Sequence, residues 1–372
     1  MKLSLKQLAS VLASYVDDNK ISVDSFSVTR DNTVGLLDKV AKIFTIETNF
    51  VDKLAIFDGE DLSYGKIVEE WASDLILAEA FDPDGAGALS PHDSTYRPVF
   101  YSYTLGRKVI PQTIRNDDIE RAVHNEAQFI SIIEDKTRKM YDSETMLKYG
   151  IKREALGVLA EMCIAMQDAS QVNAYGTTTA YSVNDLVKEN GSATDVYIFV
   201  KPKTTTSMTW ANAIANGYII KLDLIETLAK PVDTSTGEAF IKALKGAKEV
   251  ASDYSEGHSL NGNTLGATPE DGLVLVMLQG IQPSLEVDTM AGAFHEDKVA
   301  LPVKEIVVPD FGSANSKIWA VLLDARGCKL HNTYRAVREN INGHGDFLNM
   351  FFHTENTVFL SRNVYVRVFK TA

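Results

Sequence analysis

One acidic segment of the sequence comes close to a calcium-binding loop. Asp82, Asp84 and Asp93 supply carboxylates at positions one, three and twelve of such a loop, but position five is Ala86. An oxygen ligand is therefore missing, and no helix clearly leads into the segment. The pattern favours the tip of a β-hairpin over a calcium site.

The sequence shows no other motif with the residue spacing that its chemistry requires. Residues 59–66 are one residue too long for a phosphate-binding loop, and Ile67 stands where a serine or threonine must hold magnesium. The seven histidines lack metal-ligand spacing. We find no nucleophile elbow and no dinucleotide fingerprint. The sequence predicts no catalytic residue, no cofactor and no metal, and so no enzyme.

The two cysteines, Cys163 and Cys328, are too isolated to make a zinc site or a disulfide framework. Cys163 lies in an apolar run with helical spacing, and Cys328 follows a glycine after a strand-like segment. We expect both to be small buried apolar residues in a reducing cytoplasm.

Composition points to a globular protein with an acidic surface. The chain has 372 residues, 45% of them hydrophobic, and a net charge of −13. Its length suggests about two domains. An acidic surface repels phosphate backbones, so we expect no tight or sequence-specific grip on DNA. The sequence has no apolar run of about 18 residues, so we expect no membrane anchor.

Residues 61–115 change in character from the helical pieces before them. Two extended arms flank a tip rich in Gly, Pro and Asp, and the second arm spans residues 98–110. This long hairpin has few residues that could form a core. Because a lone two-stranded hairpin is marginal in water, we expect it to lie on another surface.

The rest of the chain is predicted to be α+β. Residues 117–168 form the strongest helical stretch, with a second run starting after Ser143 and a kink at Gly150 and Gly157. Between residues 169 and 330, strands and helices alternate. We expect strands at 195–200, 272–278, 306–308 and 317–323, and helices at 211–228 and 237–250. Residues 331–372 should form long antiparallel strands that return to the layer of the long helix.

Two stretches and the order of the parts resemble a known family. Residues 65–75, which read GKIVEEWASDL, and residues 112–118, which read QTIRNDD, are similar to major capsid proteins of small podophages of the phi-29 type, as are residues 329–368. The resemblance implies the Hong Kong 97 capsid fold. It implies an N-terminal arm (1–60), an extended loop (61–115), a peripheral domain with a long spine helix (116–168 and 331–372) and an axial domain (169–330).

The resemblance also implies a function and partners. The protein would be the head protein of a tailed double-stranded DNA bacteriophage. Many copies would assemble in the host bacterial cytoplasm into pentamers and hexamers, and the icosahedral or prolate shell would enclose the genome in the virion. The portal would be one partner. A separate scaffolding protein would be another, because we see no long charged leader that could act as a fused scaffold. The chain also differs from these relatives in showing no immunoglobulin-like domain after the peripheral strands.

The extended loop supplies our candidate contact residues. We expect these residues to contact neighbouring subunits: Glu69, Glu70, Trp71, Asp82, Asp84, Asp93, Arg97, Arg107 and Lys108. The loop must flex where curvature changes, and these glycines are the expected pivots: Gly65, Gly85, Gly87 and Gly106. Two alternatives stay open, an encapsulin-like shell that encloses cargo proteins and a cytoplasmic α+β enzyme with an unrecognised site.

Overall fold

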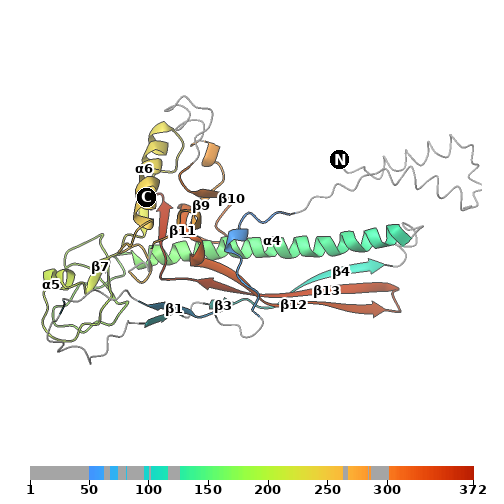
Figure 1. The fold of residues 1–372 in the computed structure, drawn as a ribbon, viewed down its shortest axis with the longest axis horizontal. Helices are drawn as coiled ribbons and strands as arrows, with labels where there is room; N and C mark the ends of the chain where they lie inside the picture. Colours follow the sequence, from blue (N-terminus) through green and yellow to red (C-terminus); the bar gives the residue numbers. More distant parts are fainter. Residues whose placement is uncertain are drawn as a thin grey trace, which may run out of the picture. The chain divides into compact units, whose positions relative to one another are not determined.

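The computed structural model describes residues 50–62, 68–73, 81, 96–99, 102–115, 126–262, 267–283, 285 and 301–372 (Figure 1). The chain divides into two compact units. The described parts of the first are residues 50–51, 110–115, 126–145 and 337–351. The second comprises the described residues of 52–109, 146–336 and 352–372.

A single long helix, α4 (Glu126–Met166), replaces the two helical runs and the kink that the sequence predicted. The residues that suggested a new start are accommodated inside the helix, because the Ser143 and Thr145 hydroxyls donate to the carbonyls of Lys139 and Tyr141. The predicted helix start at residues 117 and 118 lies outside the described residues.

Four strands form the sheet that contains the longest hairpin of the described chain. In it, β12 (Cys328–Asn342) and β13 (Phe347–Leu360) are neighbours, and β3 (Ser102–Thr104) and β4 (Lys108–Arg115) both pair with β13. The sequence had assigned residues 98–110 to one arm of the protruding hairpin. That was wrong for residues 102–104 and 108–110, because β13 supplies them with partners within the same chain.

The described part of the protruding hairpin is a two-stranded ribbon. Strand β1 (Glu70–Ser73) pairs with β2 (Tyr96–Val99) in antiparallel register, with Glu70 opposite Val99. Between these strands only residue 81 is described. The ribbon thus agrees with two extended arms, while its tip lies outside the described residues.

A five-stranded sheet forms the centre of the second unit, in the order β10-β9-β11-β14-β8. The strands β9 (Leu273–Leu278), β10 (Lys304–Val308) and β11 (Ile318–Asp324) lie where the sequence predicted them. The strand β14 (Val366–Lys370) pairs with β11 and with β8 (Ile225–Thr227). The sequence predicts that this last strand returns to the long helix, and Val366 and Val368 of β14 share a core cluster with Leu156 of α4.

The predicted helix at residues 211–228 is also wrong. Only α5 (Trp210–Ala215) is helical, and it is followed by β7 (Ile219–Lys221) and β8. Gly217 takes a φ of +63°, which ends the helix after one short stretch. Strand β7 then joins β5 (Leu186–Val187) and β6 (Tyr197–Phe199) in a small three-stranded sheet.

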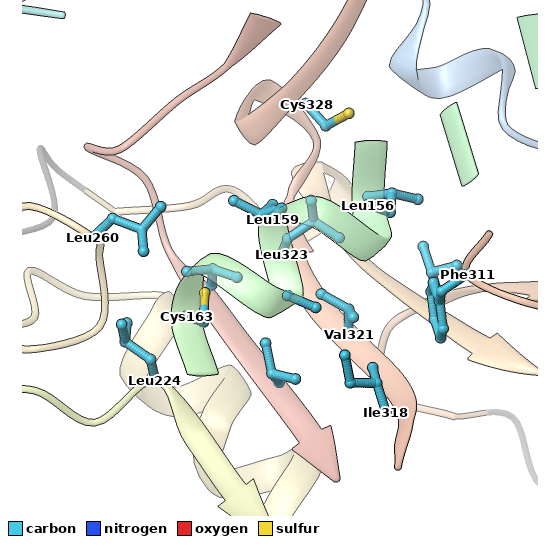
Figure 2. Close-up of a cluster of buried hydrophobic side chains, with 14 of the residues drawn as sticks. Leu156, Leu159, Cys163, Leu224, Leu260, Phe311, Ile318, Val321, Leu323 and Cys328 are labelled. Carbon is cyan, nitrogen blue, oxygen red and sulfur yellow. The ribbon is translucent and has the colours of Figure 1, made fainter. Parts of the chain in front are cut away.

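The central sheet is buried on both faces, which explains its unbroken apolar strands. On one face, alternate residues such as Val276, Val321 and Leu323 pack against the C-terminal half of α4, as Figure 2 shows for the labelled side chains. The other face packs against α6 (Thr234–Ala251), where Phe240 contacts Trp319. Three short 3₁₀ helices complete the description: Ala55–Phe57, Glu270–Gly272 and Ala325–Gly327.

Candidate assembly surface

Both cysteines lie in the core of the protein. Cys163 and Cys328 are free and buried, and burial raises the pKa of each thiol to about 12, so neither provides a thiolate at neutral pH (Figure 2). Within the described ranges, no three His, Cys, Asp or Glu side chains are grouped to hold a metal ion. None of the helices described is long and apolar enough to cross a membrane.

Six of the predicted contact and pivot residues lie outside the described residues. These are Asp82, Asp84, Asp93, Gly65, Gly85 and Gly87. For Trp71 and Arg97 the structure describes the backbone, which places Trp71 opposite Pro98 and Arg97 opposite Ala72 in the ribbon. Glu69 and Lys108 are exposed. Gly106 is open, because an added Cβ would meet nothing within 4 Å.

Glu70 ties the base of the ribbon to a turn of its own chain. The Ser361 hydroxyl donates to Glu70 Oε1 over 2.8 Å. The other carboxylate oxygen is buried and has no hydrogen-bond partner among the described atoms. Burial therefore raises the pKa of Glu70, although Ser361, Asn363 and the charge of Arg326 partly offset this effect.

We expect Glu70→Gln to stabilise the protein more as the pH rises. A carboxyl whose pKa is raised by folding contributes stability at low pH and loses it as the pH rises through the raised value. Glutamine can still accept from Ser361 and carries no charge to desolvate. Urea unfolding at acid and at mildly alkaline pH measures this difference. An equal effect of the substitution at both pH values would contradict the argument, and exposed Glu69→Gln is the control.

Arg107, another predicted contact residue, is held by side chains of its own chain. Its Nε lies 3.3 Å from the buried carboxylate of Glu355, and its guanidinium lies 3.9 Å from the ring centroid of Tyr334. Such stacking is a favourable cation–π contact. The side chain remains 48% exposed. These contacts orient the Arg107 side chain, and its exposed part is accessible to another molecule.

No sequence pattern predicted the clamp of acidic and carbonyl groups around Lys152 on α4. This lysine is buried, and its ammonium donates to Asp52 Oδ2 over 2.5 Å and to the Leu54 carbonyl over 3.3 Å, and it also pairs with Asp58. The clamp fixes residues 52–62, which we call the strap. The strap also buries Leu54 and Phe57 in the main core.

The strap continues along the start of β12. Asp58 forms a parallel bridge with Leu330, and the Leu330 carbonyl accepts from the Gly59 amide over 2.8 Å. The Asn332 carbonyl accepts from Leu62 over the same distance. Sequence periodicity could not find this feature, because a single lysine on a helix is usually exposed.

One family of known proteins matches nearly the whole chain. A family model described as Phi29-like phage major capsid protein matches residues 4–370. Comparison of the sequence with curated proteins gives no match.

Among solved structures, the chain is similar to one in the capsid of Staphylococcus phage Andhra, with a TM-score of 0.56 and 11% identity, over 88% of this chain and 86% of that chain. It is also similar to a chain of native bacteriophage P68, solved with its head fiber and inner core protein gp22 (TM-score 0.49, 10% identity, 88% and 87% covered). A third similar structure is the capsid of cyanophage P-SCSP1u (TM-score 0.48, 10% identity, 94% and 99% covered). The likeness to the Andhra chain shows that this mixed α/β chain has the fold of phage capsid structures.

Proposed function

Because the chain belongs to the Phi29-like phage major capsid proteins and is a phage head shell protein, we propose that its copies assemble as pentamers and hexamers of a closed shell around double-stranded DNA. The family match over nearly the whole chain is the observation that carries this proposal. Contacts that close into rings produce five- and six-membered units. The shell is icosahedral or prolate and forms in the host bacterial cytoplasm before it becomes the virion.

The parts of the chain take the roles expected of the Hong Kong 97 fold. Residues 1–60 are the arm, α4 is the spine of a peripheral domain (116–168 and 331–372), and residues 169–330 are an axial domain around the five- and six-fold centres. The long helix and the β12–β13 hairpin support this division. Strand β14 belongs with the axial domain, since it pairs with β11 and β8.

The extended loop lies across a neighbouring subunit and contacts it with the β1–β2 ribbon and the hairpin tip. Since β3 and β4 pair with β13 of the same chain, the part that reaches the neighbour is the part before residue 102. Glu69, Trp71 and Arg97 make contacts there, with Asp82, Asp84 and Asp93 at the tip. Gly65, Gly85 and Gly87 are pivots of this part, and Gly106 is a pivot between β3 and β4. Apolar area buried by such a loop stabilises at about 25 cal/mol per Å².

The shell encloses double-stranded DNA without sequence-specific binding. With a net charge of −13, the chain does not trap phosphate backbones during packaging. The protein has no enzymatic activity, cofactor or membrane contact in this role. A scaffolding protein directs assembly, and the portal occupies one vertex of the shell.

Electron microscopy of the expressed chain tests the proposal. We expect the chain alone to form irregular or open assemblies, and uniform closed shells when a scaffolding protein is added. Uniform shells from the chain alone would refute the need for a scaffold and leave the shell function intact. A chain that stays monomeric under both conditions would overturn the shell function. Particles from infected cells should contain nuclease-protected double-stranded DNA; protein cargo instead would indicate a nanocompartment.

A further inference from the structure

The C-terminal half of α4 has a second line of side chains, on the side of the helix opposite the core. On the core side, Leu156, Leu159 and Cys163 pack in the main core (Figure 2). On the other side, steps of alternately four and three residues place side chains in one row along the helix. We call these residues the outer seam: Leu147, Ile151, Glu154, Val158, Glu161 and Ala165.

The outer seam combines accessible apolar side chains with acidic charge. Val158 is 43% exposed, and Ala165 is exposed as well. Glu154 and Glu161 alternate with these apolar positions and are exposed, although one oxygen of Glu161 accepts from the Asn315 amide. Exposed apolar side chains next to charge of one sign are typical of a surface that binds a partner. The partner that fits this row is an amphipathic helix with basic side chains.

The N-terminal sequence has the properties of such a partner. Residues 2–16 lie outside the described residues, and their sequence contains two lysines and no acidic residue. Apolar residues follow in steps of three, four and three: Leu5, Leu8, Leu12 and Tyr15. This spacing predicts an amphipathic helix whose apolar side has the same periodicity as the outer seam. A helix of this length is marginal alone in water, so it needs a surface to pack on.

The strap keeps the N-terminal sequence within reach of the outer seam. Asp52 begins the strap and accepts from Lys152 of α4 over 2.5 Å. The outer seam is about 27 Å long at 1.5 Å per residue. Residues 17–51, if extended, span several times that length. A segment on such a tether has an effective concentration on the order of millimolar at its target. Its own α4 is therefore favoured over the α4 of another copy in dilute solution.

We propose that residues 2–16 dock as a helix on the outer seam of α4 in the same, unassembled subunit. The contact removes the apolar side chains of both helices from water. Lys2 and Lys6 give the segment a positive charge that is attracted to Glu154 and Glu161. Because the tether makes the contact intramolecular, it does not depend on protein concentration. The proposal concerns the single subunit and does not rest on the shell function.

Thiol labelling of unassembled subunits tests the proposal. Val158→Cys places a thiol on the outer seam, whereas Cys163 and Cys328 are buried and inert. We expect a maleimide to label Val158→Cys at least tenfold more slowly in the full chain than in a chain lacking residues 2–16. Lys245→Cys, at an exposed position of α6, is the control and should react equally fast in both chains.

Two outcomes of this labelling would overturn the proposal. The first is an equal rate at Val158→Cys with and without residues 2–16. The second is slow labelling that becomes fast on dilution, since the occupant would then be a second copy. Neither outcome affects the shell function, because electron microscopy of the assembled protein tests that separately.

A matched pair of variants keeps the test decisive if the shortened chain does not fold. Leu8→Asp with Leu12→Asp disrupts the apolar side of the predicted helix, whereas Gln7→Asp with Ser10→Asp adds the same charge away from that side. We expect the first pair to speed labelling of Val158→Cys at least tenfold and the second to change it less than about threefold. Equal labelling of the two variants would overturn the proposal.

Discussion

Lys152→Ala is expected to lower the free energy of unfolding by about 3 kcal/mol, because it removes one partner of a buried ionic cluster. The Lys152 side chain is 1% exposed, and that of Asp52 is 10% exposed. Without the ammonium, the Asp52 carboxylate keeps its bond from the Leu54 amide and has lost its counter-charge. Asp58 is half exposed and can turn to water, so it adds little to the loss.

The loss should begin at the strap. Leu54 and Phe57 are buried in the main core and depend on the clamp for their position. We therefore expect faster hydrogen exchange in residues 54–62 of Lys152→Ala, together with a lower midpoint in urea unfolding. Lys245→Ala, at an exposed position of α6, is the control and should change the unfolding free energy by less than about 0.5 kcal/mol.

A second substitution distinguishes charge from packing at the clamp. Asp52→Asn in the Lys152→Ala background removes the uncompensated carboxylate. We expect this double variant to recover part of the lost stability, because the buried charge is the larger cost. A single variant as stable as Lys245→Ala, or a double variant less stable than the single one, would show that the cluster does not hold the strap.

Gly157→Ala is expected to destabilise the protein by about 2 kcal/mol, because a Cβ at this position overpacks the core. The added atom would lie 2.3 Å from the Phe311 carbonyl oxygen and 2.8 Å from the Ala314 Cβ. The first of these is backbone, and it cannot rotate away. The loop after β10 is held against α4 by further bonds, since Arg153 pairs with Asp310 at 2.8 Å and the Asn315 amide donates to Glu161.

Gly150→Ala, in the same helix, is the matched control, and we expect it to change the free energy of unfolding in the opposite direction. A Cβ there would meet nothing within 4 Å. Alanine is favoured over glycine in a helix interior by about 1 kcal/mol, so this variant should be more stable than the natural chain. Urea unfolding of both variants measures whether each substitution raises or lowers the free energy of unfolding. If Gly157→Ala were also stabilising, α4 would not require a glycine at its contact with the loop.

Local pattern alone located several elements of the fold. The apolar runs at β9 and β11 and the amphipathic run at α6 depend on residues close in sequence, so period and composition were enough to find them. The strands at residues 306–308 and the α+β class followed in the same way. The resemblance at residues 65–75 and 112–118 pointed to the capsid family, which the family model over residues 4–370 now shows.

Other elements depended on partners far away in the sequence. Residues 225–227 were predicted to be helical and form β8, because β14, more than a hundred residues later, offers them an edge. Residues 102–104 and 108–115 pair with β13 for the same reason. The propensity of a short segment is weak compared with a ladder of hydrogen bonds to a distant strand.

By itself, the sequence determined the class of the fold, the family and the absence of a recognisable catalytic pattern. Only the tertiary structure decided what single residues do. Gly157, expected to kink a helix, is the place where the Phe311 carbonyl approaches it. Lys152, one of many lysines, became a buried clamp because two aspartates from the strap meet it there. Both roles arise from contacts across long sequence separations, and local periodicity carries no information about such contacts.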